Sequence, residues 1–355
     1  MACCVILVAG ACSSVPPAPY SQDAAVPAEL PRLHDARGRF REIACAVLNA
    51  RRDTVPDARP CEDALTRFGT EPEVSGRAVE LGSSRRQLVA LVVPGIGSDC
   101  ISNWLDAEET ADSHIERFGF DVRIVEVEGL SSSTRNARLV RDAIMAAPDA
   151  GGTPRLVLVG YSKGATDILE AIVAYPETRP RIAAVVSVAG AIAGSPLAED
   201  VSQKQLEMLR HWPDAECPPG DGGGIDSLQP DIRRAWLGEH ELPGTLPFYS
   251  LLTCPDPDRV SHALQPGFSK LWREHGPNDG MVLLRDQVVP GSDWLGCLNA
   301  DHWAVAVPIA RTHPTLAAAF VDDNDYPREA LLEAVLRFVE EDLDVGASRV
   351  VDGGF

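Results

Sequence analysis

Basic residues are scarce in this chain of 355 residues. It has 32 lysines and arginines against 52 aspartates and glutamates, which gives a formal net charge of −20 at pH 7. Such a charge repels nucleic-acid phosphates and anionic lipid surfaces, so we expect neither as a partner. No apolar run reaches the ~18 residues that a membrane-spanning helix needs. These shortages exclude nucleic-acid-binding and helical membrane proteins and favour an acidic globular protein.

Closely spaced cysteine pairs are absent as well. The chain has nine cysteines, and those beyond position 12 form no CxxC or CxxxC pair. Zinc ligands are usually spaced that way, so we predict no metal site, and no cofactor is predicted either. The cysteines beyond position 12 are even in number, which in an exported protein favours disulfides. The alternative is a set of reduced, partly buried thiols in a cytosolic enzyme.

The N-terminus carries an apolar stretch that favours export. Residues 5–11 read VILVAGA and precede Cys12, an arrangement that resembles a bacterial lipoprotein signal. We expect residues 1–12 to be an export signal and Cys12 to be lipidated, which would attach the protein to a membrane in the cell envelope; secretion is the related possibility. The alternative is an apolar terminus that is never exported. Residues 13–35 begin with a stretch rich in proline, alanine and serine and are expected to be a flexible linker.

Strand-like and helix-like segments alternate along the rest of the chain. Helices predicted over 40–52 and from residue 60 make 36–87 an N-terminal helical appendage. Beyond it, β-branched runs predict strands and three-four apolar spacing predicts helices. The predicted strands are 88–95, 122–129, 156–160, 182–190, 246–252 and 283–290; the predicted helices are 133–147, 163–175 and 327–343. This alternation predicts an α/β fold over 88–345, with a mostly parallel central sheet covered by helices on both faces.

One segment interrupts the alternation. Residues 191–245 contain a helix predicted over 201–212 and a glycine-rich loop. Insertions at the carboxyl edge of a parallel sheet often cover the active site, so we interpret this segment as a cap or lid. The alternative is a surface excursion without such a role.

The motif that carries chemistry is Gly160-Tyr161-Ser162-Lys163-Gly164. The pattern G-x-S-x-G is weak alone, but here a buried strand leads directly into it and a helix leads directly out. That is the arrangement of a nucleophile elbow, a strained turn that exposes the serine at the start of a helix. Ser162 is therefore the predicted nucleophile; an ordinary strand-to-helix turn is the alternative.

A serine nucleophile needs a histidine base, which follows it in the chain of such architectures. We assign the base to His302, which follows the last predicted strand in LNADHWAVAVP. His313 lies beside a proline and is the weaker candidate. The remaining downstream histidines lie in the cap or soon after it, where surface roles are expected: His211, His240, His262 and His275.

The base in turn needs an orienting carboxylate, which should come from the penultimate strand or the loop after it. Asp279, in GPNDGMVLL, stands among turn residues just ahead of the last predicted strand. Its rivals Asp256 and Asp258 follow the preceding strand more directly. Asp286 and Asp293 are less well placed, so Asp279 is the predicted acid.

Acyl transfer also requires donors for the oxyanion of the tetrahedral intermediate. One is expected to be the backbone N–H of Lys163, the residue after the nucleophile. The other should come from the glycine loop 94–99, where we choose the N–H of Ile96. The alternative is that these glycines only turn the chain.

Together these motifs resemble those of the α/β-hydrolases, and among them the secreted bacterial triacylglycerol lipases. The similar features are the glycine loop, the segment from EGLSSSTRNARLVRDAI to LVLVGYSKG, the cap, NDGMV for the acid and NADHW for the histidine. The chain departs from those lipases at Pro94-Gly95, where they usually have His-Gly, and at Tyr161 and Lys163, where they usually have His and Gln. The resemblance implies an α/β-hydrolase fold and lipase-like or esterase-like activity more than a preference for long-chain triglycerides.

The predicted function is hydrolysis of a carboxylic ester through an acyl-enzyme on Ser162, with a small-molecule or lipid ester as substrate. The same three residues also serve acyltransferases and thioesterases. A protein of another class, a catalytically silent α/β-hydrolase fold that acts as a surface binding module, is the remaining alternative.

Three disulfides are predicted. Cys45 and Cys61 are close in sequence and flank a proline-containing turn. Cys254 and Cys297 follow neighbouring strands and should meet at one edge of the sheet. That leaves Cys100 to pair with Cys217 in the cap, which would tie the cap to the oxyanion loop.

Overall fold

The computed structural model describes residue 30 and residues 33–100, 111–148, 155–200, 218, 220–315, 318, 321–323 and 325–352. Its strands are β1 (His34–Asp35), β2 (Leu65–Thr66), β3 (Val89–Val93), β4 (Asp121–Ile124), β5 (Leu156–Tyr161), β6 (Ile182–Val188), β7 (Phe248–Thr253) and β8 (Asp293–Leu298). They form one sheet in the order β1-β8-β7-β6-β5-β3-β4, and β2 pairs with β8 outside this path. Every pairing is parallel except that of β2 with β8.

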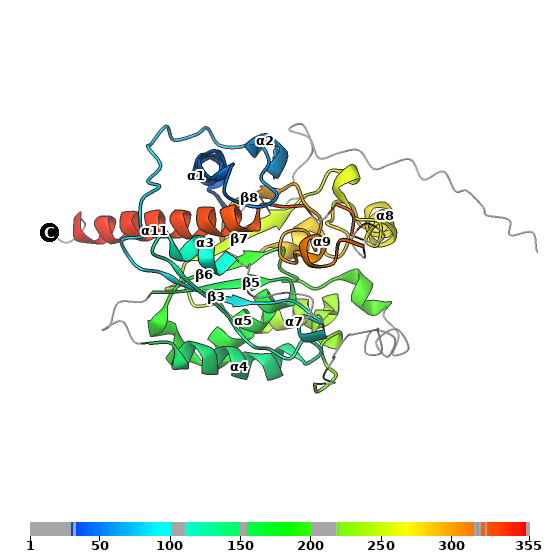
Figure 1. Ribbon diagram of the computed structural model, residues 1–355. Coiled ribbons are helices and arrows are strands. Elements are labelled where there is room, and N and C mark those ends of the chain that lie inside the picture. Colours follow the sequence, from blue (N-terminus) through cyan, green and yellow to red (C-terminus); the bar gives the residue numbers. More distant parts are fainter. Residues whose placement is uncertain are drawn as a thin grey trace, which may run out of the picture.

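Helices cover both faces of this sheet, as predicted (Figure 1). The described helices are α1 (Arg37–Arg51), α2 (Cys61–Ala64), α3 (Ala111–Glu116), α4 (Ser133–Ala146), α5 (Lys163–Ala174), α7 (Pro230–Glu239), α8 (Gln265–Glu274), α9 (Ile309–Thr312) and α11 (Arg328–Asp352). One face packs against α1, α3 and α11, and its apolar core includes Phe40, Ile115 and Val339. The other face packs against α4 and α5, with Val140 and Ile168 in its core. This two-sided burial explains why β5 and β6 are almost continuously apolar.

The prediction of a last strand over residues 283–290 is wrong. Residues Leu284–Gln287 form a 3₁₀ turn, and the strand that occupies this place in the sheet is β8. The cause lies in Gln287, whose buried side chain accepts a hydrogen bond from the backbone N–H of Thr253 at the end of β7. This contact holds the segment across the end of β7 instead of alongside the sheet. The strand predicted over 122–129 is shorter than expected, since β4 ends at Ile124.

The N-terminal region is joined to the body through the sheet and through α11. The strands β1 and β2 pair with successive parts of β8. On α11, Glu333 is fully buried and accepts hydrogen bonds from Arg51 of α1, His114 of α3 and Arg337 of its own helix. The helix predicted from residue 60 is a single turn, α2, because the chain then enters β2.

Two of the predicted disulfides are present in the structure. Cys45 is bonded to Cys61, which joins α1 to α2. Cys254 is bonded to Cys297, which joins the end of β7 to β8. Cys100 is also disulfide-bonded. Its predicted partner Cys217 lies outside the described residues, so that pairing stays a prediction.

Only part of the predicted cap is described. The helix predicted over 201–212 and His211 lie outside the described residues. The described part of the segment includes α7 and a glycine-rich stretch that packs against the start of α4, where Asp221 accepts hydrogen bonds from the backbone and hydroxyl of Ser132 at 2.7 and 2.6 Å. In the described part of the chain no helix is long and apolar enough to cross a membrane.

Candidate active site

The predicted site residues meet at one edge of the sheet because the strands that carry them are parallel. The chain leaves β3 into the glycine loop with Ile96, and it leaves β5 at Ser162. The loop after β8 carries His302, and β7 ends at Thr253. Since parallel strands end at the same edge, segments far apart in the sequence come together there.

Ser162 lies in a strained turn between β5 and α5. Its φ and ψ are 53° and −121°, a conformation that non-glycine residues rarely adopt. The turn is tight enough that Gly160 and Gly164 have no room for a side chain: a Cβ on Gly160 would overlap Ala165, and one on Gly164 would overlap the carbonyl oxygen of Val93 in β3. Glycine is therefore required at both positions, because the neighbouring backbone comes too close to leave room for a side chain.

Ser162, His302 and Asp279 form one chain of hydrogen bonds. The serine Oγ lies 2.8 Å from Nε2 of His302, and Nδ1 of His302 lies 2.7 Å from Oδ2 of Asp279. All three are buried, with exposed fractions of 5%, 2% and 0%. This geometry suits a hydroxyl that gives its proton to an imidazole held by a carboxylate.

The carboxylate of Asp279 is held by four further donors. The backbone N–H groups of Met281 and Val282 donate to Oδ1 at 3.0 and 2.8 Å. The hydroxyl of Thr253 donates to Oδ2 at 2.6 Å, and the amide of Gln287 donates to the same oxygen at 3.2 Å. Sequence reasoning missed Thr253 and Gln287; the one available signal was that Thr253 directly follows a predicted strand.

The loop that carries His302 is fixed from two sides. The hydroxyl of Tyr161 donates to the carbonyl oxygen of His302 at 2.7 Å, and the two rings lie 5.3 Å apart. Burial, with the nearby charges of Asp279 and Asp301, raises the pKa of Tyr161 well above its usual value, so this hydroxyl stays a donor. Asp301 accepts hydrogen bonds from the backbone of Trp303 and Ala304, which closes the turn after the histidine.

The side chain of Lys163 points away from the reacting atoms. Its ammonium group is fully buried and forms an ion pair with Asp167 one turn along α5, at 2.7 Å. Asp167 also accepts a hydrogen bond from Asn136 of α4 at 2.8 Å. Lys163 is the first residue of α5, so its backbone N–H has no acceptor within the helix and is available to another group.

The glycine loop lies close against the nucleophile. A Cβ on Gly95 would come within 3.1 Å of the Cβ of Ser162, which places the loop backbone beside the serine. The loop is closed by a hydrogen bond from the N–H of Gly97 to the carbonyl of Gly129, at 3.1 Å. Ile96 packs against an apolar group that includes Ala191 and Met281. These contacts hold the loop beside Ser162.

Aspartates and histidines that were weaker candidates for the acid and the base have other partners. Asp256 accepts a hydrogen bond from Asn299 at 2.9 Å, and Asp293 begins β8 beside His34. His240 stacks on Trp236 with ring centroids 4.7 Å apart. His262 pairs with Asp322 at 2.9 Å. In the described part of the chain, none of these residues joins the Ser162–His302–Asp279 chain of hydrogen bonds.

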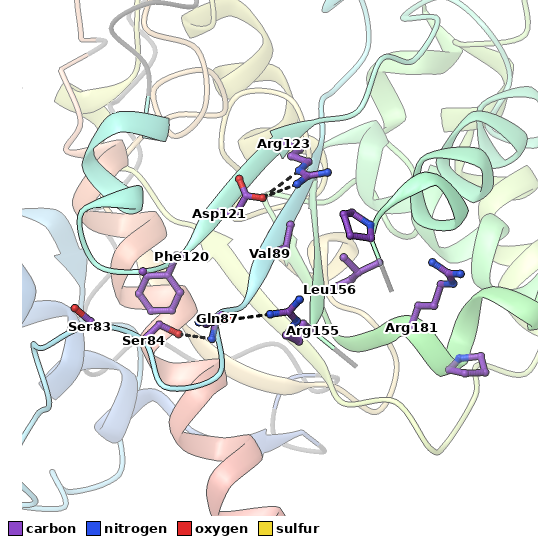
Figure 2. A pocket seen from close by; sticks show the side chains of 13 residues that line it. Ser83, Ser84, Gln87, Val89, Phe120, Asp121, Arg123, Arg155, Leu156 and Arg181 are labelled. Carbon is purple, nitrogen blue, oxygen red and sulfur yellow. Dashed lines mark hydrogen bonds and ion pairs between the residues drawn. The ribbon is translucent and has the colours of Figure 1, made fainter. Parts of the chain in front are cut away.

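In the described part of the chain, no group of three or more His, Cys, Asp or Glu side chains could hold a metal ion. A cavity of about 480 Å³ lies at the opposite, amino edge of the sheet, around Val89, Asp121 and Leu156 (Figure 2). That cavity is not part of the candidate active site.

Comparison with known proteins shows a strong similarity to a solved structure. No protein-family model matches the chain, and neither does any curated protein. Among solved structures, a metagenomic carboxyl esterase, MGS0156, has 39% sequence identity and a TM-score of 0.82, covering 91% of this chain and 97% of its own. The lipase of Staphylococcus hyicus has 11% identity and a TM-score of 0.52, covering 77% of this chain and 100% of its own, which indicates a shared fold alone.

A strained serine at the carboxyl edge of a mostly parallel sheet, between a strand and a helix, is the arrangement of the α/β-hydrolase fold. The chain belongs to the α/β-hydrolase superfamily, and the predicted fold is confirmed. Within that superfamily its similarity is to the metagenomic carboxyl esterase over nearly the full length of both chains.

Proposed function

We propose that this protein hydrolyses carboxylic esters through an acyl-enzyme on Ser162, with His302 as general base and Asp279 as the acid that orients it. The observation that carries the proposal is the continuous hydrogen-bond chain from the serine Oγ through His302 to Asp279, at 2.8 and 2.7 Å. The similarity to a carboxyl esterase supports an ester as substrate.

The reaction begins when Oγ of Ser162 attacks the ester carbonyl carbon and its proton passes to Nε2 of His302. The tetrahedral intermediate collapses as His302 returns that proton to the departing alcohol, which leaves the acyl group on the serine. Water then attacks the acyl-enzyme, with His302 again taking and returning the proton, and the carboxylic acid is released. The Asp279 carboxylate stabilises the imidazolium formed in each half-reaction.

The negative charge on the carbonyl oxygen needs donors that are already in place. We assign them to the backbone N–H groups of Lys163 and Ile96. The first begins α5, where the helix dipole favours negative charge, and the second lies in the loop held against Ser162. The ion pair of Lys163 with Asp167 keeps the lysine side chain out of this position.

A substrate panel tests the proposal. p-Nitrophenyl esters of increasing acyl length should be hydrolysed by the purified protein, and the Ser162→Ala variant should lose on the order of 10⁶-fold in turnover. Unchanged hydrolysis by the variant would refute the role of Ser162. Adding a thioester and an alcohol acceptor to the panel separates ester hydrolysis from thioesterase and acyltransferase activity, and complete inactivity of the wild type favours a binding module.

We also propose that the protein acts outside the cytoplasm. Its bonded cysteines, Cys45–Cys61 and Cys254–Cys297, are of a kind that persists in oxidising compartments. Attachment through a lipidated Cys12 stays a prediction, because that residue lies outside the described residues. Metabolic labelling with a fatty acid, compared between the wild type and Cys12→Ser, tests it.

A further inference from the structure

The cavity at the amino edge of the sheet has the features of a binding site that the ester hydrolase reaction does not use. It lies where β3, β4 and β5 begin, at the opposite end of these strands from Ser162 (Figure 2). Its volume of about 480 Å³ is within the range of small-molecule sites. The question is which ligand chemistry its lining favours.

Three of the lining residues are arginines and one is an aspartate. They are Arg123, Arg155, Arg181 and Asp121. Asp121 is already paired with Arg123, whose Nη2 lies 2.8 Å from the carboxylate. Neither Arg155 nor Arg181 has a carboxylate within 4.0 Å among the described residues. Among the described residues, these two guanidinium charges at the cavity are therefore uncompensated, in a chain with a net charge of −20.

These two guanidinium groups also have spare donors. Within the described ranges, Arg155 donates one side-chain hydrogen bond, to the side-chain oxygen of Gln87 at 2.9 Å, and its buried Nε has no hydrogen-bond partner. Arg181 likewise donates one there, to the carbonyl oxygen of Ala147 at 2.9 Å. A guanidinium has five N–H donors, and a buried donor without an acceptor lowers stability. An anionic ligand would satisfy both the charge and the free donors.

The rest of the lining combines the polar residues Ser83, Ser84 and Gln87 with a larger group of apolar ones. The carbon side chains of Val89, Phe120 and Leu156 and the rings of Pro148 and Pro180 form the walls. A bare inorganic ion would leave these walls in contact with water, whereas an organic anion would cover them.

We propose that this cavity binds a small organic anion, a carboxylate or phosphate monoester on an apolar body, with Arg155 and Arg181 as its anion-binding residues. The planar forks of the two arginines suit the paired oxygens of such a group. The site is separate from Ser162, and the proposal does not depend on the proposed function.

Isothermal titration with phenyl phosphate and with benzoate tests the proposal and distinguishes the two anion types. Phenol serves as the neutral probe with the same ring. We expect at least one of the anions to bind one-to-one with a dissociation constant of about 1 mM or below, and phenol not to bind. Failure of both anions to bind, or equal binding of phenol, would overturn the proposal.

Variants locate the binding. Arg155→Gln and Arg181→Gln should each weaken it by about tenfold or more, and Arg155→Lys should recover only part, because it keeps the charge without the planar fork. Arg52→Gln is the matched control, because it changes the net charge equally. Arg52 is exposed, lies outside the cavity and, in the described part of the chain, bonds only the side chain of Asn49. An equal loss of anion binding in the Arg52 variant would show that binding depends only on net charge and would contradict the proposed site. Undiminished binding in both the Arg155 and the Arg181 variant would place the anion elsewhere and would contradict it as well. Thermal unfolding without ligand shows that each variant is folded.

Discussion

Thr253 and Gln287 hold the oxygen of Asp279 that faces His302. Asp279 is fully buried, and the same oxygen that meets His302 also accepts the Thr253 hydroxyl at 2.6 Å. Gln287 connects the two, since it donates to Asp279 and accepts from the backbone of Thr253. We interpret Thr253 as a positioning residue, which acts on the reaction through the aspartate and does not touch the substrate.

Replacement of Thr253 by valine tests this interpretation. Valine has nearly the same shape but cannot donate, and a hydrogen bond to a charged group contributes about 1.5–3 kcal/mol, so we expect kcat to fall by about 10–100-fold with little change in KM. Thr253→Ser keeps the hydroxyl and should retain most of the activity. Equal losses in the valine and serine variants would indicate a packing role instead.

The role of Asp279 in orienting His302 can be tested against Asp256, the alternative acid. Asp279→Asn should fold normally and lose about 10⁴-fold in kcat, because an amide no longer holds the imidazole in the required tautomer. Asp256→Asn is the control, since Asp256 bonds Asn299 and not His302. Kinetics with a p-nitrophenyl ester decide between them: a larger loss in the Asp256 variant would transfer the role to that residue.

At the scale of elements, the join between β5 and α5 depends on glycine. The methyl group of Gly164→Ala would overlap the backbone of Val93, so we expect a loss of about 1–3 kcal/mol in the free energy of unfolding and a strong loss of activity. Gly238→Ala in α7 is the matched control, because nothing lies within 4 Å of its added methyl. That variant should be neutral or more stable by about 0.5–1 kcal/mol. Thermal unfolding of the two variants measures the difference, and equal stability would contradict the close approach.

The same elements show what the sequence could and could not predict. The strand β5 and the helix α5 were predictable because their apolar patterns are long and because G-x-S-x-G lies between them. The strand β8 was not, since DWLGCL has no β-branched residue and contains a glycine, while LLRDQVVP, which has two valines, contains a 3₁₀ turn. Asp279 was found through its NDG turn. Thr253 and Gln287 act through tertiary contacts 26 and 8 residues away in sequence from the aspartate, which no local pattern encodes.

For the whole molecule, Glu333 joins helices from both ends of the chain. Burial alone would raise the pKa of Glu333, but hydrogen bonds from His114, Arg51 and Arg337 outweigh it and lower this pKa to about 2. The folded protein therefore binds the proton more weakly than the unfolded chain. The stabilisation is fully present above the usual pKa of 4.5 and is lost as the pH falls toward 2.

Glu333→Gln removes this source of stability. Because it leaves the partly buried Arg51 and the buried Arg337 without a carboxylate, we expect the free energy of unfolding at pH 7 to fall by about 3–5 kcal/mol. The difference from the wild type should shrink as the pH is lowered below 4.5. Denaturant titrations at several pH values measure this, with the exposed Glu62→Gln as a control expected to change stability by less than about 0.5 kcal/mol. A difference that does not vary with pH would contradict the assignment.

If Ser162 is the nucleophile of an ester hydrolase, an electrophile that reacts with activated serines should label it covalently. A fluorophosphonate transfers its phosphonyl group to a serine that is activated by a histidine base. We predict a single adduct per chain, located by peptide mass spectrometry on Ser162, and no adduct in the His302→Ala variant. A folded protein that remains unlabelled, or an adduct on another serine, would contradict the account.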